Sequence, residues 1–188
     1  MAKRPEPEDR IARRDALADE IARIVLADGL GTLGLRGLAA RLCTSGRMLL
    51  YYFGTKDALV VAVLRRISER MGAIMATHAG GPPVTAGVFL ARVLKLSQVP
   101  EIAPFMRVWT DVVARGARGE TPYDAVAAET VGQWIAWIES RLLPEARGRG
   151  EAAAILSIVD GITLVEMARP GTTMAARALL PGLLDGTG

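Results

Sequence analysis

The chain has 188 residues, of which 51% are hydrophobic and 23% charged, a composition that excludes an intrinsically disordered protein. No apolar run approaches the roughly 18 residues of a membrane span, and the polar start MAKRPEPEDR lacks the apolar core of a secretory signal. One cysteine excludes an internal disulfide, so a cytoplasmic location is expected. The net charge is +3, and residues 1–66 hold 12 Lys and Arg against 8 Asp and Glu. This excess agrees with a polyanionic partner for that part of the chain.

Apolar residues recur at helical spacing along the chain, and no segment reads as a strand. In the first helix, for example, Leu17, Ile21 and Val25 lie four residues apart. Glycines, prolines and short polar stretches separate the helices, which are predicted over residues 9–28, 35–42, 46–53, 56–77, 84–98, 101–115, 123–143, 151–168 and 172–184. The fold class is therefore predicted to be all-α, with about nine helices.

The most informative segment is residues 35–53, two short helices joined by a tight turn at Cys43–Ser45. This arrangement is typical of a helix-turn-helix, whose second helix enters the DNA major groove. The second helix ends in Tyr51 and Tyr52, and Lys56 opens the next helix, so hydroxyls and an ammonium group are available for phosphate. The segment therefore predicts a DNA-binding element.

Residues 10–66 resemble the N-terminal DNA-binding domain of TetR-family transcriptional regulators. The family pattern is a short helix ending near Ile-Ala, then Gly-Val-Ser, Leu-Tyr-Tyr-His-Phe, Ser-Lys-Glu and a Leu. The matching segments here are Leu38-Ala39, Cys43-Thr44-Ser45, Leu49-Leu50-Tyr51-Tyr52-Phe53, Thr55-Lys56-Asp57 and Leu59.

The chain departs from this pattern at four positions. Leu50 replaces a tyrosine that commonly touches phosphate, Tyr52 replaces the histidine, and Gly34 stands where a threonine often caps the helix. Cys43 replaces the turn glycine, which predicts that this position needs no positive φ.

The resemblance implies that three parts of the chain have different functions. Residues 1–8 would be a flexible basic arm, 9–55 the helix-turn-helix domain and 56–188 a helical ligand-binding and dimerisation domain. The protein would bind a palindromic double-stranded operator as a homodimer, as a repressor released by a small molecule of unknown identity. It would be no enzyme and would use no cofactor or metal.

The DNA-binding candidates cluster around the second helix of the motif. Arg47 would donate two hydrogen bonds to a guanine, and Met48 would contact a thymine methyl group. The full candidate set is Arg36, Thr44, Ser45, Gly46, Arg47, Met48, Tyr51, Tyr52 and Lys56. Basic residues near the start would reach the flanking phosphates: Lys3, Arg4, Arg10, Arg13 and Arg14.

The candidates for the other two functions lie further along the chain. Aromatic and methionine side chains would line the effector site: Met71, Met75, Phe89, Phe105, Trp109 and Trp134. Trp137, three residues after Trp134, would share its helix face. The apolar faces of the last two helices would form the dimer interface through Ile155, Ile158, Val159, Ile162, Val165, Leu179 and Leu183.

Two other functions stay open at this point. Gly29, Gly31 and Gly34 match G-x-G-x-x-G, the signature of an NAD(P)-dependent oxidoreductase, which requires strands that Ile24–Leu26 and Met48–Phe53 would have to supply. The other alternative is a helical carrier of small molecules that does not bind DNA. A single histidine, His78, and a single cysteine make no zinc site, and no catalytic constellation is apparent.

Overall fold

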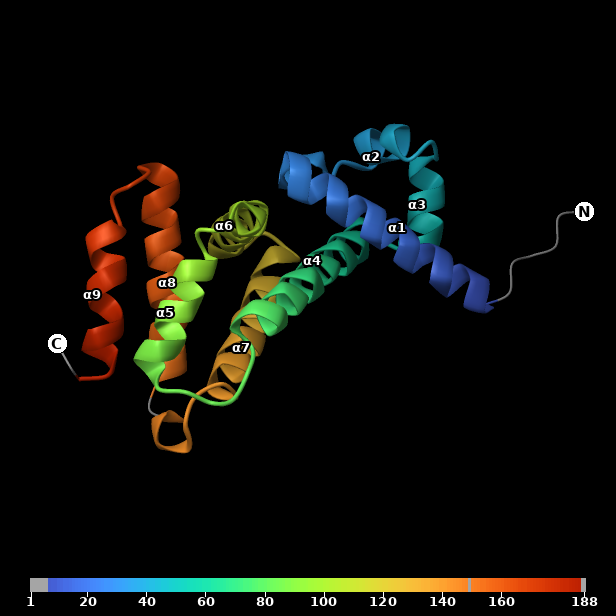
Figure 1. The fold of residues 1–188 in the computed structure, drawn as a ribbon. Helices are drawn as coiled ribbons and strands as arrows, with labels where there is room; N and C mark the ends of the chain where they lie inside the picture. The colour runs from blue at the N-terminus through green and yellow to red at the C-terminus, as the bar shows by residue number, and fades with distance from the viewer. Residues whose placement is uncertain (1–6, 149, 187–188) are drawn as a thin grey trace, which may run out of the picture. The chain divides into compact units, whose positions relative to one another are not determined.

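The structure is a computed structural model, and it describes residues 7–148 and 150–186. Over these residues it is all-α, as predicted, with one isolated bridge and no extended strand (Figure 1). The helices are α1 (Pro7–Asp28), α2 (Leu35–Arg41), α3 (Gly46–Phe53), α4 (Lys56–Ala79), α5 (Ala86–Leu96), α6 (Ala103–Ala117), α7 (Tyr123–Glu139), α8 (Glu151–Ala168) and α9 (Met174–Leu184), with single 3-10 turns at Leu30–Thr32, Pro100–Ile102 and Pro144–Ala146. None of the described helices has the length and apolarity needed to span a bilayer.

Helices α5 and α7 are each four residues shorter than predicted, for reasons visible in their hydrogen bonds. Helix α5 begins at Ala86 rather than at residue 84, because the side chain of Thr85 accepts the Val88 N–H and caps the helix. Helix α7 ends at Glu139 rather than at residue 143. The chain there leaves the helix to exchange backbone hydrogen bonds with Val84, in a bridge that pairs Val84 with Leu142.

The described residues pack into two compact units. Unit 1 comprises the chain up to Arg70 together with Arg107–Val126, and unit 2 comprises Met71–Met106 together with the chain from Ala127 onward. The predicted division near residue 55 concerns function and stays a prediction. By packing, the first part of α4 belongs with the helix-turn-helix.

Unit 1 is built around the helix-turn-helix. Helix α3 contacts both α1 and α2. Each of the four N-terminal helices contributes side chains with no more than 6% exposure: Leu17, Ile21 and Val25 from α1, Leu38 from α2, Leu49 and Phe53 from α3, and Leu59 and Val63 from α4. The predicted stripe of α1 is therefore confirmed, and the recognition helix is held by an apolar core on its inner side.

In unit 2, α5 lies beside both α8 and α9 (Figure 1). Phe89 and Leu90 of α5 and Ile155 of α8 are fully buried. Helix α9 has no fully buried side chain of its own. Its contacts with α5 include the polar ones described below.

Candidate nucleic-acid interface

The turn between α2 and α3 is a Schellman motif. The N–H of Thr44 donates to the carbonyl of Ala39 at 2.9 Å, and the N–H of Cys43 donates to that of Ala40 at 3.4 Å. Cys43 occupies the left-handed position with φ 47°. The prediction that this position needs no positive φ is therefore wrong: the closing hydrogen bonds demand the conformation even though the residue carries a Cβ.

Both ends of the recognition helix α3 are closed by specific groups. At its start, the side-chain oxygen of Ser45 accepts the N–H of Met48 at 3.1 Å, which is an N-cap. This bond uses a lone pair, so the Ser45 hydroxyl still has a proton to donate. At its end, Gly54 with φ 81° turns the chain away, and its N–H donates to the carbonyl of Leu50.

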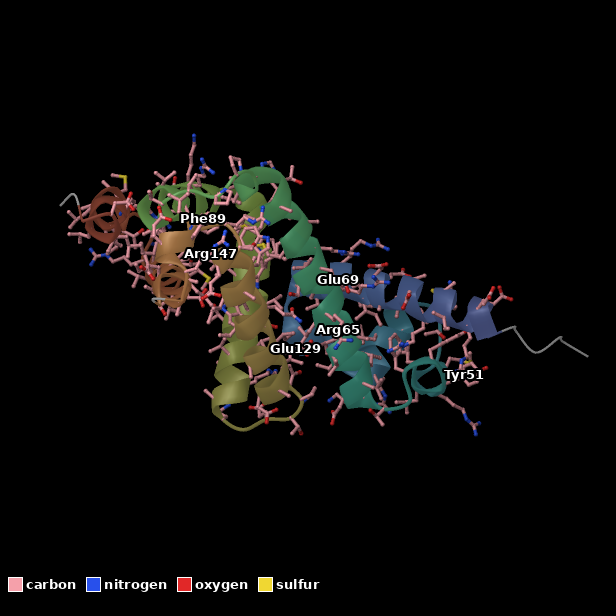
Figure 2. All side chains as sticks on the ribbon, turned by 90° about the horizontal axis from the view of Figure 1, so that it is seen from below. Tyr51, Arg65, Glu69, Phe89, Glu129 and Arg147 are labelled. Atoms are coloured by element: carbon pink, nitrogen blue, oxygen red, sulfur yellow. The ribbon has the colours of Figure 1, made fainter. Side chains whose placement is uncertain are left out.

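Helix α3 has one buried and one exposed face. Leu49 is fully buried and Phe53 is 6% exposed. Three other large side chains of α3 face outward, with 41% of Met48, 37% of Leu50 and 46% of Tyr51 exposed. Figure 2 marks Tyr51 on this helix, and its ring meets that of Tyr52 edge-on with centroids 5.2 Å apart. Sequence reasoning did not place Leu50 on the outward face, although the helical offset of one residue from Leu49 would have indicated it.

The remaining candidate groups come from the three helices around α3. Thr55 caps α4 by accepting the N–H of Ala58 at 3.0 Å, which leaves Lys56 exposed in the first turn. Arg36 is exposed on the first turn of α2. On α1, Arg10, Arg13 and Arg14 are exposed, and the guanidinium of Arg14 lies 5.7 Å from the ring centroid of Phe53. Lys3 and Arg4 lie outside the described residues.

A network of ion pairs joins α1 to α4. Arg66 lies within 3.3 Å of Asp15 and 2.9 Å of Glu69, and Arg70 donates to both the carboxylate and the backbone carbonyl of Asp19. The hydrogen bond with Glu69 raises the pKa of the Arg66 guanidinium, although partial desolvation opposes this rise. Asp15, Asp19 and Glu69 are thereby paired with arginines of the same unit.

Only some of the residues predicted to line the effector site lie close together. In unit 2, the Trp137 ring lies 5.7 Å from that of Phe89 and 5.5 Å from that of Trp134, both edge-on. The expectation that the two tryptophans share a helix face is confirmed by this contact. Phe89, marked in Figure 2, is fully buried, and Met75 is 5% exposed. Met71 and Phe105 are half-buried in the same unit, but Trp109, also half-buried, belongs to unit 1.

The dimer candidates divide into two groups. Ile155 is fully buried and Ile162 is 7% exposed, so both serve the core of unit 2 and are not free for a partner, which corrects their assignment. Ile158 and Val159 are half-buried. The exposed apolar side chains of α8 and α9 include three predicted and three unpredicted residues: Val165, Leu179, Leu183, Leu164, Met167 and Met174.

The glycine motif does not belong to a dinucleotide fold. The residues that would have to be strands, Ile24–Leu26 and Met48–Phe53, lie within helices α1 and α3. Gly29 with φ 86° follows α1, and Gly31 lies in the 3-10 turn after it. Because the motif needs a strand before its glycines, the oxidoreductase hypothesis is wrong. Within residues 7–148 and 150–186, no group of three His, Cys, Asp or Glu side chains is arranged to hold a metal ion.

Comparison with known proteins agrees with this geometry. No protein-family model matches the chain. The HTH-type transcriptional regulator BetI of Burkholderia thailandensis is 26% identical over 161 residues, which cover 82% of each chain. A crystal structure of the multidrug binding protein EbrR complexed with imidazole superposes with a TM-score of 0.69 and 27% identity, covering 95% of this chain and 91% of that one.

A Rhodococcus sp. protein assigned to the TetR family of transcriptional regulators has the same fold, with a TM-score of 0.70 and 22% identity, covering 93% of this chain and 97% of that one. These two solved chains thus share the fold of this one over more than nine-tenths of its length. The chain is therefore similar in sequence to an HTH-type transcriptional regulator and in fold to a TetR-family one.

Proposed function

We propose that this protein is a ligand-responsive repressor that binds a palindromic operator as a homodimer in the cytoplasm and catalyses no reaction. The observation that carries the proposal is the two-sided recognition helix. Its inner face is anchored by Leu49 and Phe53, while Met48, Leu50 and Tyr51 face outward without burial. A short, capped helix that exposes large side chains beside arginines suits the DNA major groove.

The exposed groups sort into base-reading and phosphate-holding sets. At the start of α3, Arg47 is exposed and would donate both guanidinium arms to the O6 and N7 of a guanine, while Met48 would pack on a thymine methyl group. The surrounding donors would fix the register through phosphates: Arg36, Thr44, Ser45, Tyr51, Tyr52 and Lys56. Gly46 leaves room at the start of α3 for close approach to DNA, because it lacks a side chain.

The first amides of α4 add to this set. The helix dipole and the unpaired N–H groups of a helix start favour an anion there. Leu50 has no hydrogen-bonding group, so a phosphate contact is not proposed at that position. Tyr52, which is half-buried against Tyr51, retains a hydroxyl for this purpose.

The proposed effector site is the aromatic cluster Phe89, Trp134 and Trp137 in unit 2. Its support is the edge-on contact of the three rings and the likeness to EbrR, a multidrug binding protein solved with imidazole. An effector that binds better to one conformation of the dimer shifts the population toward that conformation. Helix α4 begins beside the recognition helix and continues into unit 2, so it is the proposed carrier of the change.

Selection of bound sequences from random duplex DNA tests this function. We expect recovery of one palindrome whose half-sites are centred about one helical turn apart, because a two-fold dimer presents two α3 helices to one face of the duplex. Recovery of a site without two-fold symmetry would contradict the dimer. Recovery of no preferred sequence, with effector-sized ligands still bound to the tryptophan cluster, would favour the helical carrier instead.

A further inference from the structure

Helix α9 is fastened to α5 at its C-terminal end by one carboxylate. Asp185, the residue after α9, accepts the Gly87 N–H through Oδ1 at 2.8 Å and the Thr85 hydroxyl through Oδ2 at 2.9 Å. Thr85 and Gly87 form the start of α5, where unpaired N–H groups and the helix dipole favour a negative charge. Asp185 therefore completes the cap of a helix about one hundred residues earlier in the chain.

The two backbones approach closely at this point. A Cβ added to Gly87 would overlap the carbonyl oxygen of Pro181 and lie 2.6 Å from the Asp185 carboxyl carbon. Gly87 has an ordinary helical conformation, so the glycine is needed here for space rather than for its φ. The absence of a side chain lets the end of α9 rest directly on the start of α5.

The other end of α9 is fastened by Arg177. Its Nη1 donates to the carbonyl of Leu94 at 2.8 Å and to the hydroxyl of Ser97 at 2.9 Å, at the end of α5. Its Nε donates to the Thr173 hydroxyl at 2.9 Å. That hydroxyl in turn donates to the carboxylate of Glu166, which also accepts the N–H of Gly171. The α8–α9 turn and the end of α5 are thus joined in one network.

These two attachments leave the other side of α9 apolar. Arg177 is the one charged residue within α9, and its guanidinium is hydrogen-bonded to the end of α5. Leu179 and Leu183, one turn apart and on the far side of the helix from Arg177, are 59% and 54% exposed. A partner for such a face must bring no unpaired charge, since burying one is costly. The same face of a second copy meets that requirement, and a two-fold pairing presents identical patches to each other.

We infer that Asp185 and Arg177 are positioning residues for self-association, which fix α9 on α5 so that its apolar face is presented to the second copy in one register. The inference rests on the homodimer of the proposed function. A helix that is already ordered in the free chain loses less conformational entropy on association, and so pairs more tightly. Neither residue need touch the partner to have this effect.

The test is the monomer–dimer dissociation constant, measured by sedimentation equilibrium of the full chain, with far-UV circular dichroism to check folding. We expect Asp185→Ala to weaken the dimer about tenfold, because α9, no longer held on α5 by its two hydrogen bonds, must then be ordered when the copies associate. Arg177→Met, which keeps the aliphatic stem, is expected to weaken it similarly. Asp185→Asn is expected to have a smaller effect, since its amide oxygen still accepts the Gly87 N–H.

A core substitution in the other unit separates positioning from general stability. Ile21 is fully buried in unit 1, so Ile21→Val lowers stability while leaving α9 untouched, and we expect its dimer to be as tight as that of the wild type. Dimers of Asp185→Ala and Arg177→Met as tight as the wild type would overturn the inference but leave the proposed homodimer standing. A wild type that stays monomeric at every concentration would overturn the proposed homodimer, and the inference with it.

Discussion

Replacement of Cys43 by glycine is expected to stabilise the protein. Cys43 holds φ 47° because the Schellman hydrogen bonds of Thr44 and Cys43 require it. For a residue with a Cβ, this left-handed conformation costs about 1–2 kcal/mol. Glycine removes that cost but has a more flexible unfolded chain, which offsets about 0.5–1 kcal/mol. The net gain is therefore about 0.5–1 kcal/mol, or roughly 1–4 °C in melting temperature for a chain of this size.

The assay is thermal unfolding followed by circular dichroism, with two companion variants. Cys43→Ala removes the thiol but keeps the Cβ, so its melting temperature should match the wild type. Cys43→Val adds β-branching, which is disfavoured at positive φ, and should lower it. Because the Cys43 side chain is exposed, changes in burial do not complicate the series. A glycine variant no more stable than the alanine variant would show that the left-handed conformation of Cys43 costs no stability.

Three further predictions concern binding and acid stability. Lys56→Gln should weaken binding to all duplexes alike and reduce the slope of log affinity against log salt by about 1 in titrations at several salt concentrations; a loss confined to the operator would contradict a phosphate contact. Arg47→Ala should cost about 1–3 kcal/mol on the operator and relax selection at one base pair, and an unchanged preference in a repeated selection would argue against base contact. Arg92→Ala, exposed on α5 in unit 2, is the matched control for both and should bind as the wild type does. Hydrogen bonds from the Thr173 hydroxyl and from the Gly171 N–H lower the pKa of Glu166. The Glu166 carboxylate therefore contributes its full stabilisation when the pH is above the ordinary carboxyl pKa of about 4.3. This stabilisation is lost as the pH falls through the lower pKa of the folded protein. In the Glu166→Gln variant, the free energy of unfolding should therefore fall less between neutral and acid pH than in the wild type. An equal fall in both proteins would show that the carboxylate contributes nothing.

The helices of unit 1 are predictable because their apolar spacing and their caps are local in the sequence. Ser45 and Thr55 each cap the helix that immediately follows, and Leu17, Ile21 and Val25 form one stripe. The conformation of Cys43 was missed because residue preference indicated no positive φ, whereas the hydrogen bonds of the turn require it. Geometry imposed by two neighbouring helices overrides the preference of one residue.

Unit 2 is less predictable, because its apolar residues have several possible partners. The sequence shows that Ile155 and Val165 lie on an apolar face of α8, but only the packing of α5 decides that the first is buried and the second 44% exposed. Likewise, nothing local connects Asp185 with Gly87, which is 98 residues away. Contacts between distant segments therefore had to come from the structure.

The most direct test of the account is a titration of the selected palindrome and of a scrambled duplex with the wild-type protein at two salt concentrations. We expect two chains bound per palindrome, with at least about a thousandfold preference over the scrambled duplex at physiological salt. We also expect a steep loss of affinity for both duplexes at the higher salt. Equal affinity for the two duplexes, or one chain bound per palindrome, would contradict sequence-specific recognition by a dimer.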